Sequence, residues 1–352
     1  MSAKQSRWGL AAAVGMGILI LDSKTALLGA TAGLQLCILS LIPSLFPFFV
    51  LSSLLSSALM GTKLPLLGPL RKLLRIPEGC ESLLIPGFLG GYPAGAQCIG
   101  QALGQERISR TDARRLLLFC NNAGPSFLFG VLGPVFSEKW MLWALWGVQI
   151  AAALLCSRIL PELPDRTCSM KRTEPSLPDA LAAGIRILAT VCGWVIFFRV
   201  IIAFCERWFL WLLPAALQVA VKGALELANG CCTLVLIADD RLRFVIASGL
   251  LSFGGLCVTM QTASVIGNLP LSSYVFSKLL QSLFCLGFSA AIMYRAVWMY
   301  PLLGICALCL KKVVAFSGFL MYNDAINLRR NPYAVSKENR TRLHILPVWH
   351  SA

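Results

Sequence analysis

Charged side chains are scarce in this chain of 352 residues, of which Asp, Glu, Lys and Arg make up only 13%. A soluble domain carries about 25%. Hydrophobic residues account for 57% of the sequence, so an ordinary soluble domain is excluded and a polytopic membrane protein is predicted. The formal charge of +15 comes from Lys and Arg in short loops between apolar segments. That distribution is typical of contacts with lipid headgroups, so the lipid bilayer is the expected partner and nucleic acid is not.

Histidine is almost absent, because His344 and His350 both lie in the C-terminal tail. Neither a His-based nucleophile nor a His-bound metal can therefore be assembled within the membrane. The chain also lacks a Walker loop, a dinucleotide-binding glycine motif after a strand and an HExxH motif. We expect that the protein is not an enzyme and that it has no catalytic residue, no metal and no cofactor.

Cysteine is plentiful by contrast, with fourteen copies. Most of them lie inside apolar segments, where a thiol acts as a small apolar side chain. The single CxxC pair, Cys306 and Cys309, has no second pair and no nearby His. It therefore does not indicate a metal site.

Apolar and polar segments divide the chain into six regions. They are an N-terminal helix (1–25), a first membrane repeat (26–160), a polar linker (161–180), a second membrane repeat (181–298), a C-terminal apolar segment (299–320) and a polar tail (321–352). The first helix is predicted to be retained, because no Ala-x-Ala cleavage site follows it closely. The run 26–60 exceeds the roughly 20 residues that cross a bilayer core. It is either one long kinked span or a span followed by a half-span.

Two apolar runs between residues 87 and 136 are interrupted by Gly, Pro and amide residues. Proline is accepted in the first turn of a helix but not in its interior, so new half-helices are predicted to begin near Tyr92 and Pro125. The charged turn between the runs contains Ser109-x-x-Asp112, a capping signature that predicts a helix start at about Arg110.

The second half of the chain has interruptions in matching places. The motifs ELANG and FGG are separated by a charged turn, as GGYPAG and NNAG are in the first half. The sequence therefore predicts an internal repeat with broken helices. The residues assigned to the breaks are Gly90, Gly91, Pro93, Gly95, Gly124, Pro125, Gly230, Gly254 and Gly255.

A helix break at membrane depth frees backbone N–H and C=O groups that lipid cannot satisfy. Such breaks persist only where they are buried in protein or line a wet cavity. Matching interrupted helices in two halves indicate a binding site of the transporter type near the bilayer midplane. The polar side chains expected to line this site are Tyr92, Gln97, Asn121, Asn122, Glu226, Asn229, Thr259 and Gln261.

Several polar residues have a structural alternative. Glu226 either binds or couples a ligand, or forms an i,i+4 pair with Lys222, and the sequence favours neither. Thr259, Gln261 and Asn229 can equally serve as hydrogen-bonding contacts between helices, which is the interpretation we favour for Ser264. Three cations, Arg199, Lys278 and Arg295, lie near segment ends and are predicted to extend their charged groups to the membrane surface.

Four stretches, GFLGGYPAGA, RISRTDARRLLLFCNNAGPSFLFG, GALELANG and SFGGLCVTMQTASV, resemble in the same order the YlbJ-like sporulation integral membrane proteins. This family is related to a wider group with a gate or nucleoside-recognition domain. That domain also occurs in concentrative nucleoside transporters, ferrous-iron transport proteins and spore maturation proteins. The resemblance covers about residues 34–298. It implies a role in endospore formation in a Gram-positive bacterium, without indicating a particular solute.

We therefore predict an all-α polytopic membrane protein with two gate-like repeats that contain broken or re-entrant helices. The expected location is the bacterial cell membrane, with the forespore and mother-cell membranes as candidates. The leading hypothesis is that the protein is required for endospore formation and passes or senses a small polar solute. The alternative is a non-transporting scaffold that assembles the spore envelope with other sporulation membrane proteins. An intramembrane enzyme acting on a lipid-linked substrate ranks third.

Overall fold

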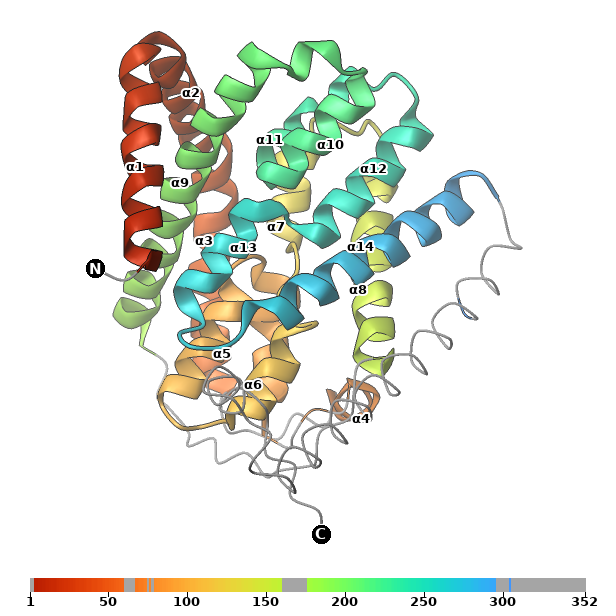
Figure 1. Ribbon diagram of the computed structural model, residues 1–352. Coiled ribbons are helices and arrows are strands. Elements are labelled where there is room, and N and C mark those ends of the chain that lie inside the picture. Colours follow the sequence, from red (N-terminus) through yellow and green to blue (C-terminus); the bar gives the residue numbers. More distant parts are fainter. Residues whose placement is uncertain are drawn as a thin grey trace, which may run out of the picture.

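The computed structural model describes residues 3–59, 67–74, 76, 79–159, 176–295 and 304. Every regular element formed by these residues is a helix (Figure 1). Five helical stretches are long and apolar enough to cross a membrane. They are Ser23–Leu59, Lys139–Ile159, Leu177–Trp208, Asp240–Val265 and Leu271–Met293. Together with the composition, they make the chain an all-α, multi-pass membrane protein.

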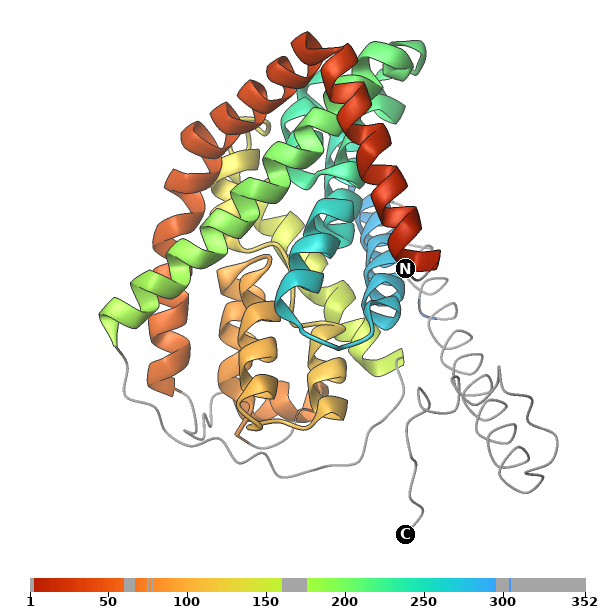
Figure 2. The same ribbon diagram turned by 60° about the vertical axis from the view of Figure 1, so that its left-hand side comes forward.

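The N-terminal region forms two helices joined at a sharp turn (Figure 2). α1 (Ala3–Leu21) ends beside Asp22, whose side chain caps the start of α2 (Ser23–Leu36). A π-helical turn, η1 (Cys37–Leu41), joins α2 directly to α3 (Ile42–Leu59). Residues 26–59 therefore belong to one long helix and not to a span with a separate half-span.

The π-helical turn has a local cause in the sequence. Pro43 has no N–H, so the carbonyl of Leu39 cannot receive its usual α-helical hydrogen bond. A single wider turn before the proline keeps the helix continuous, which is how most π-turns occur within α-helices. Proline therefore changes the local winding here and does not end the helix.

α9 (Leu177–Trp208) packs along α2 and α3 (Figure 2). A Cβ at Gly29 would come within 2.8 Å of Val200 Cα, and one at Gly33 within 2.9 Å of Ile196 Cα. Small residues one turn apart allow membrane helices to approach this closely. The contact joins the long helix of the first half to the long helix of the second.

The first half then follows the predicted series of broken segments. The elements are α4 (Gly68–Leu74), η3 (Glu81–Leu83), η4 (Pro86–Gly90), α5 (Ala94–Gly104), α6 (Arg110–Leu117), α7 (Pro125–Phe127), η5 (Leu128–Leu132) and α8 (Lys139–Ile159). Ser109 caps α6 by accepting a hydrogen bond from Asp112 N at 3.0 Å. The predicted helix starts at Arg110 and Pro125 are confirmed, and α5 begins two residues after Tyr92.

The second half also consists of helices separated by short interruptions. Its elements are η6 (Leu210–Leu212), α10 (Ala215–Leu225), α11 (Leu227–Thr233), η7 (Leu234–Leu236), α12 (Asp240–Phe253), α13 (Gly255–Val265) and α14 (Leu271–Met293). Figure 1 shows α5 and α6 toward one end of the molecule and α10 and α11 toward the other. The two short-helix pairs therefore approach the middle from opposite ends.

The glycines at the breaks have two different roles. Gly91 (φ +85°), Gly254 (φ +76°) and Gly255 (φ +79°) have left-handed backbone conformations that favour glycine. Gly95 and Gly230 were predicted at breaks, but they lie inside α5 and α11. A Cβ on Gly95 would overlap Cys120 O, and one on Gly230 would overlap Gly223 Cα. These two glycines permit close helix packing and do not interrupt the helices.

Several sequence-based predictions lie wholly or largely outside the described residues. They concern the polar linker 161–180, of which only residues 176–180 are described, the apolar segment 299–320 and the tail 321–352. The Cys306 and Cys309 pair lies outside them as well.

The close packing of α5 makes a testable prediction. Gly95→Ala is expected to destabilise the protein, because overpacking a tight contact costs about 1–3 kcal/mol. Gly104→Ala in the same helix is the matched control, since nothing lies within 4 Å of its added Cβ. Thermal melting of both variants in detergent measures the difference. Equal melting temperatures would contradict the close approach of α5 to Cys120.

Candidate functional site

The breaks of the two halves contact one another. Tyr92 follows the first break, and its hydroxyl donates to Leu251 O or Ser252 O, at 3.1 and 3.3 Å. Both carbonyls lie in the last turn of α12, directly before Gly254. Asn121 extends the contact, because its Nδ2 donates to Thr262 Oγ1 at 3.0 Å in α13. Residues at the interruptions of the first half therefore contact α12 and α13 of the second half.

A small cavity of about 30 Å³ lies where these breaks meet. Its walls are mainly apolar and come from η1, α3, α7, α9, α11 and α13. Three of the eight predicted side chains line it, namely Tyr92, Glu226 and Gln261. The space suffices for one or two water molecules, whereas pockets for small organic ligands measure roughly 300–1,000 Å³. The space in the described arrangement is thus too small for any larger solute.

Glu226 is buried and forms the break between α10 and α11. Its extended backbone (φ −143°, ψ +121°) ends α10, and its carboxylate caps α11. Oε1 accepts from Ala228 N at 2.9 Å, while Oε2 accepts from Asn229 N at 2.7 Å and Asn229 Nδ2 at 2.6 Å. The carboxylate therefore satisfies the N–H groups that the break leaves free.

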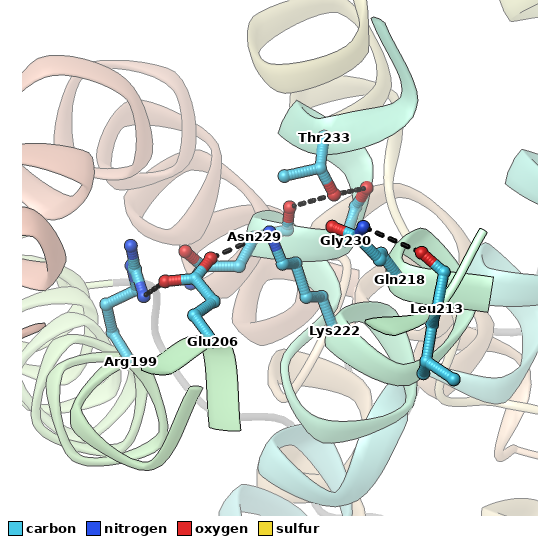
Figure 3. A network of polar contacts seen from close by, with 8 residues as sticks. All are labelled: Arg199, Glu206, Leu213, Gln218, Lys222, Asn229, Gly230 and Thr233. Atoms are coloured by element: carbon cyan, nitrogen blue, oxygen red, sulfur yellow. Dashed lines mark hydrogen bonds and ion pairs between the residues drawn. The ribbon is translucent and has the colours of Figure 1, made fainter. Parts of the chain in front are cut away.

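The alternative pairing of Glu226 with Lys222 was wrong. Lys222 Nζ instead lies 2.7 Å from Glu206 Oε1, and Glu206 Oε2 accepts from Arg199 Nη1 at 2.9 Å (Figure 3). Glu206 thus links α9 to α10. Arg199 was predicted to extend to the membrane surface. Its side chain is instead only 19% exposed and pairs with Glu206.

The paired asparagines are buried and bind protein groups. Asn121 Oδ1 accepts from Ala96 N at 3.3 Å, and its Nδ2 also donates to Tyr274 OH at 2.9 Å. Asn122 Nδ2 donates to Phe119 O at 2.6 Å. Both side chains therefore hold the break before α7 in place, and neither lines the cavity.

Three further predicted residues lie away from the cavity. Thr259 donates to Gly255 O within its own helix, Asn229 donates to Glu226, and Gln97 is half-buried in α5. Ser264, which we expected to join two helices, donates to Gln261 O within α13. Hydrogen bonds to residues three or four positions away therefore satisfy several of the polar side chains near the breaks.

Lys278 was not predicted among the residues beside the helix breaks. The expectation that it reaches the membrane surface was wrong, because Lys278 in α14 is only 1% exposed. Its Nζ donates to Asn122 Oδ1 and to Gln281 Oε1, each at 3.0 Å. The sequence contained a signal for this, since Tyr274, Ser277, Lys278 and Gln281 have the spacing of one polar face on a helix. Arg295, in contrast, is exposed at the end of α14.

Comparison with known proteins agrees with this architecture. Over 309 aligned residues the chain is 26% identical to the sporulation integral membrane protein YlbJ of Bacillus subtilis strain 168, and the match covers 73% of each chain. The chain is therefore similar to a sporulation integral membrane protein over most of its length. No family model and no solved structure matches it. The similarity supports a multi-pass membrane location and the resemblance drawn from the four sequence motifs.

The ion pair of Lys222 gives a second prediction. Glu206→Gln and Lys222→Met are expected to couple in a double-mutant cycle by about 0.5–3 kcal/mol, the range for groups in contact. Glu226→Gln with Lys222→Met is the matched cycle and is expected to give a clearly smaller coupling. Free energies of unfolding in detergent provide both values. A larger coupling in the Glu226 cycle would show instead that Lys222 pairs with Glu226, its i,i+4 neighbour.

Proposed function

We propose that the protein passes a small polar solute across a membrane during spore formation. The observation that carries this proposal is the convergence of broken helices from both halves on one cavity that contains Glu226 and Gln261. Broken helices at corresponding places in two halves are a recurrent design of transporter sites. The name of the relative, a sporulation integral membrane protein, supplies the physiological setting of the proposal.

Two gate-like repeats of inverted topology would provide the movement. The short-helix pairs α5–α6 and α10–α11 lie toward opposite ends of the molecule (Figure 1). Displacing one half relative to the other would separate Tyr92 from Leu251 and Ser252 and enlarge the cavity. Because the cavity of about 30 Å³ is too small for an organic solute, such a displacement is required in every transport cycle.

Gln261 is the residue best placed to bind the solute. It is buried, it lines the cavity, and its Nε2 lies 3.2 Å from Cys257 Sγ. Sulfur is a weak acceptor, so this amide loses little when it turns toward a solute. Glu226, in contrast, already accepts three hydrogen bonds. We assign the hydrogen bond with the solute to Gln261. Glu226 instead caps α11 and so fixes the break that shapes the site.

Uptake into proteoliposomes tests the proposal. The purified chain is offered radiolabelled amino acids, nucleosides and inorganic phosphate, and at least one class is expected to accumulate. Gln261→Ala should reduce that uptake about three- to tenfold, the effect of losing one hydrogen bond. Thr259→Val in the same helix is the control, because its hydroxyl bonds within α13 and does not line the cavity.

The scaffold hypothesis predicts a different result. A scaffold would move none of these solutes, and Gln261→Ala would leave sporulation efficiency at the wild-type level. Loss of uptake together with reduced sporulation in Gln261→Ala, and neither defect in Thr259→Val, would support transport. A correctly folded protein that is inactive with every solute and tolerant of Gln261→Ala would overturn the proposal.

A further inference from the structure

Lys278 places a buried amine beside the breaks of the opposite half. It extends from α14, and besides its two amide contacts its Nζ lies 5.3 Å from the centroid of the Tyr92 ring and 5.8 Å from that of Tyr274. The side chain is 1% exposed. Ionisable groups buried in membrane proteins are costly and are commonly found at functional positions.

The surroundings of Nζ are built to receive an ammonium group. Asn122 Nδ2 donates to Phe119 O and Gln281 Nε2 donates to Leu118 O, each at 2.6 Å. These bonds orient both amides, so that their oxygens point to Lys278. The faces of the two tyrosine rings are also favourable places for a cation. The two amide oxygens and the two ring faces are therefore all favourable neighbours for an ammonium group.

The positive charge has no carboxylate partner among the described residues. The ion pairs within that part of the chain join Arg71, Arg199, Arg207, Lys222 and Arg243 to acids, and none includes Lys278. Glu226 is the acidic residue at the cavity wall, and three N–H donors already occupy its oxygens. The Lys278 amine is thus held by neutral groups alone in the part of the chain that the structure describes, and an oxyanion would offer it a charged partner.

Tyr92 lies between this cation and the cavity. Its side chain lines the cavity and its ring also covers Lys278 Nζ. Tyr92 follows Gly91, which has a left-handed backbone conformation (φ +85°) at the break. Its hydroxyl is held by carbonyls of α12 in the other half. A displacement of the two halves that releases this hydroxyl would uncover the amine.

We propose that Lys278 is the receptor for an oxyanion group of the transported solute, and that displacement of Tyr92 admits it. The oxyanion is a carboxylate or a phosphate, since both offer the hydrogen-bond acceptors that an ammonium group binds. This inference rests on the proposed transport function and narrows its solute to an anionic or zwitterionic compound. Lys278 donates hydrogen bonds to the solute and undergoes no covalent change.

Calorimetric titration of the full-length protein in detergent tests the site. Tyr92→Ala removes the covering ring and is expected to bind acetate, inorganic phosphate or both, whereas tetramethylammonium should not bind. Adding Lys278→Met should weaken oxyanion binding at least about tenfold, because a charge-assisted hydrogen bond is lost. Adding Lys278→Arg instead should retain it. Acetate and phosphate are titrated separately, so the preferred oxyanion is identified.

Phe127→Ala is the matched control for cavity size. Phe127 lines the same cavity, but the contacts of Lys278 do not include it. This variant should enlarge the cavity without creating oxyanion binding. If Tyr92→Ala does not elute as a folded protein in size-exclusion chromatography, Tyr92→Leu takes its place, since it retains more of the apolar packing.

Two results would overturn the inference. One is a folded Tyr92 variant that binds neither oxyanion, and the other is binding that persists unchanged with Lys278→Met. The outcome is separate from that of the uptake experiment. Oxyanion binding without any solute uptake would contradict the transport function but support the site at Lys278. Uptake without oxyanion binding would support the transport function but contradict the site.

Discussion

Backbone hydrogen bonding at the helix breaks is the constraint on which the rest of this structure depends. Each break exposes N–H and C=O groups where lipid offers no partner. Glu226 receives the first N–H groups of α11, and Tyr92 donates to the last turn of α12. Asn121 accepts from Ala96 N in α5. Most of the polar side chains near the centre are therefore engaged with the protein's own backbone.

This constraint also decides which polar groups remain for a solute. Residue types that suit a binding site equally suit the repair of a broken helix, and Asn121, Asn122 and Glu226 serve the second purpose. Gln261 and Lys278 differ from them. Gln261 bonds to a thiol, and Lys278 is held by amide oxygens, with no carboxylate partner among the residues that the structure describes. The proposed solute contacts are thus side chains that do not repair the backbone at a helix break.

The two halves are held together by contacts that movement would have to break. Tyr92 and Asn121 from the first half bind α12, α13 and α14, and Lys278 binds Asn122 in return. The cavity beside these contacts has room for only one or two waters. A transporter needs such a closed arrangement between its open ones, because an open path through the centre would dissipate the gradient.

The sequence by itself determined the membrane class and the local start points of helices. Ser109, Pro125 and Gly254 act through bonds and torsions within a few residues, so their effects can be predicted without knowing the fold. Only the tertiary structure decided that Gly95 and Gly230 are packing glycines, that Lys222 pairs with Glu206 and that Lys278 points inward. These outcomes depend on which helices become neighbours. Residue spacing along α14 places Lys278 and Gln281 on one polar face, but it does not say which helices that face will meet.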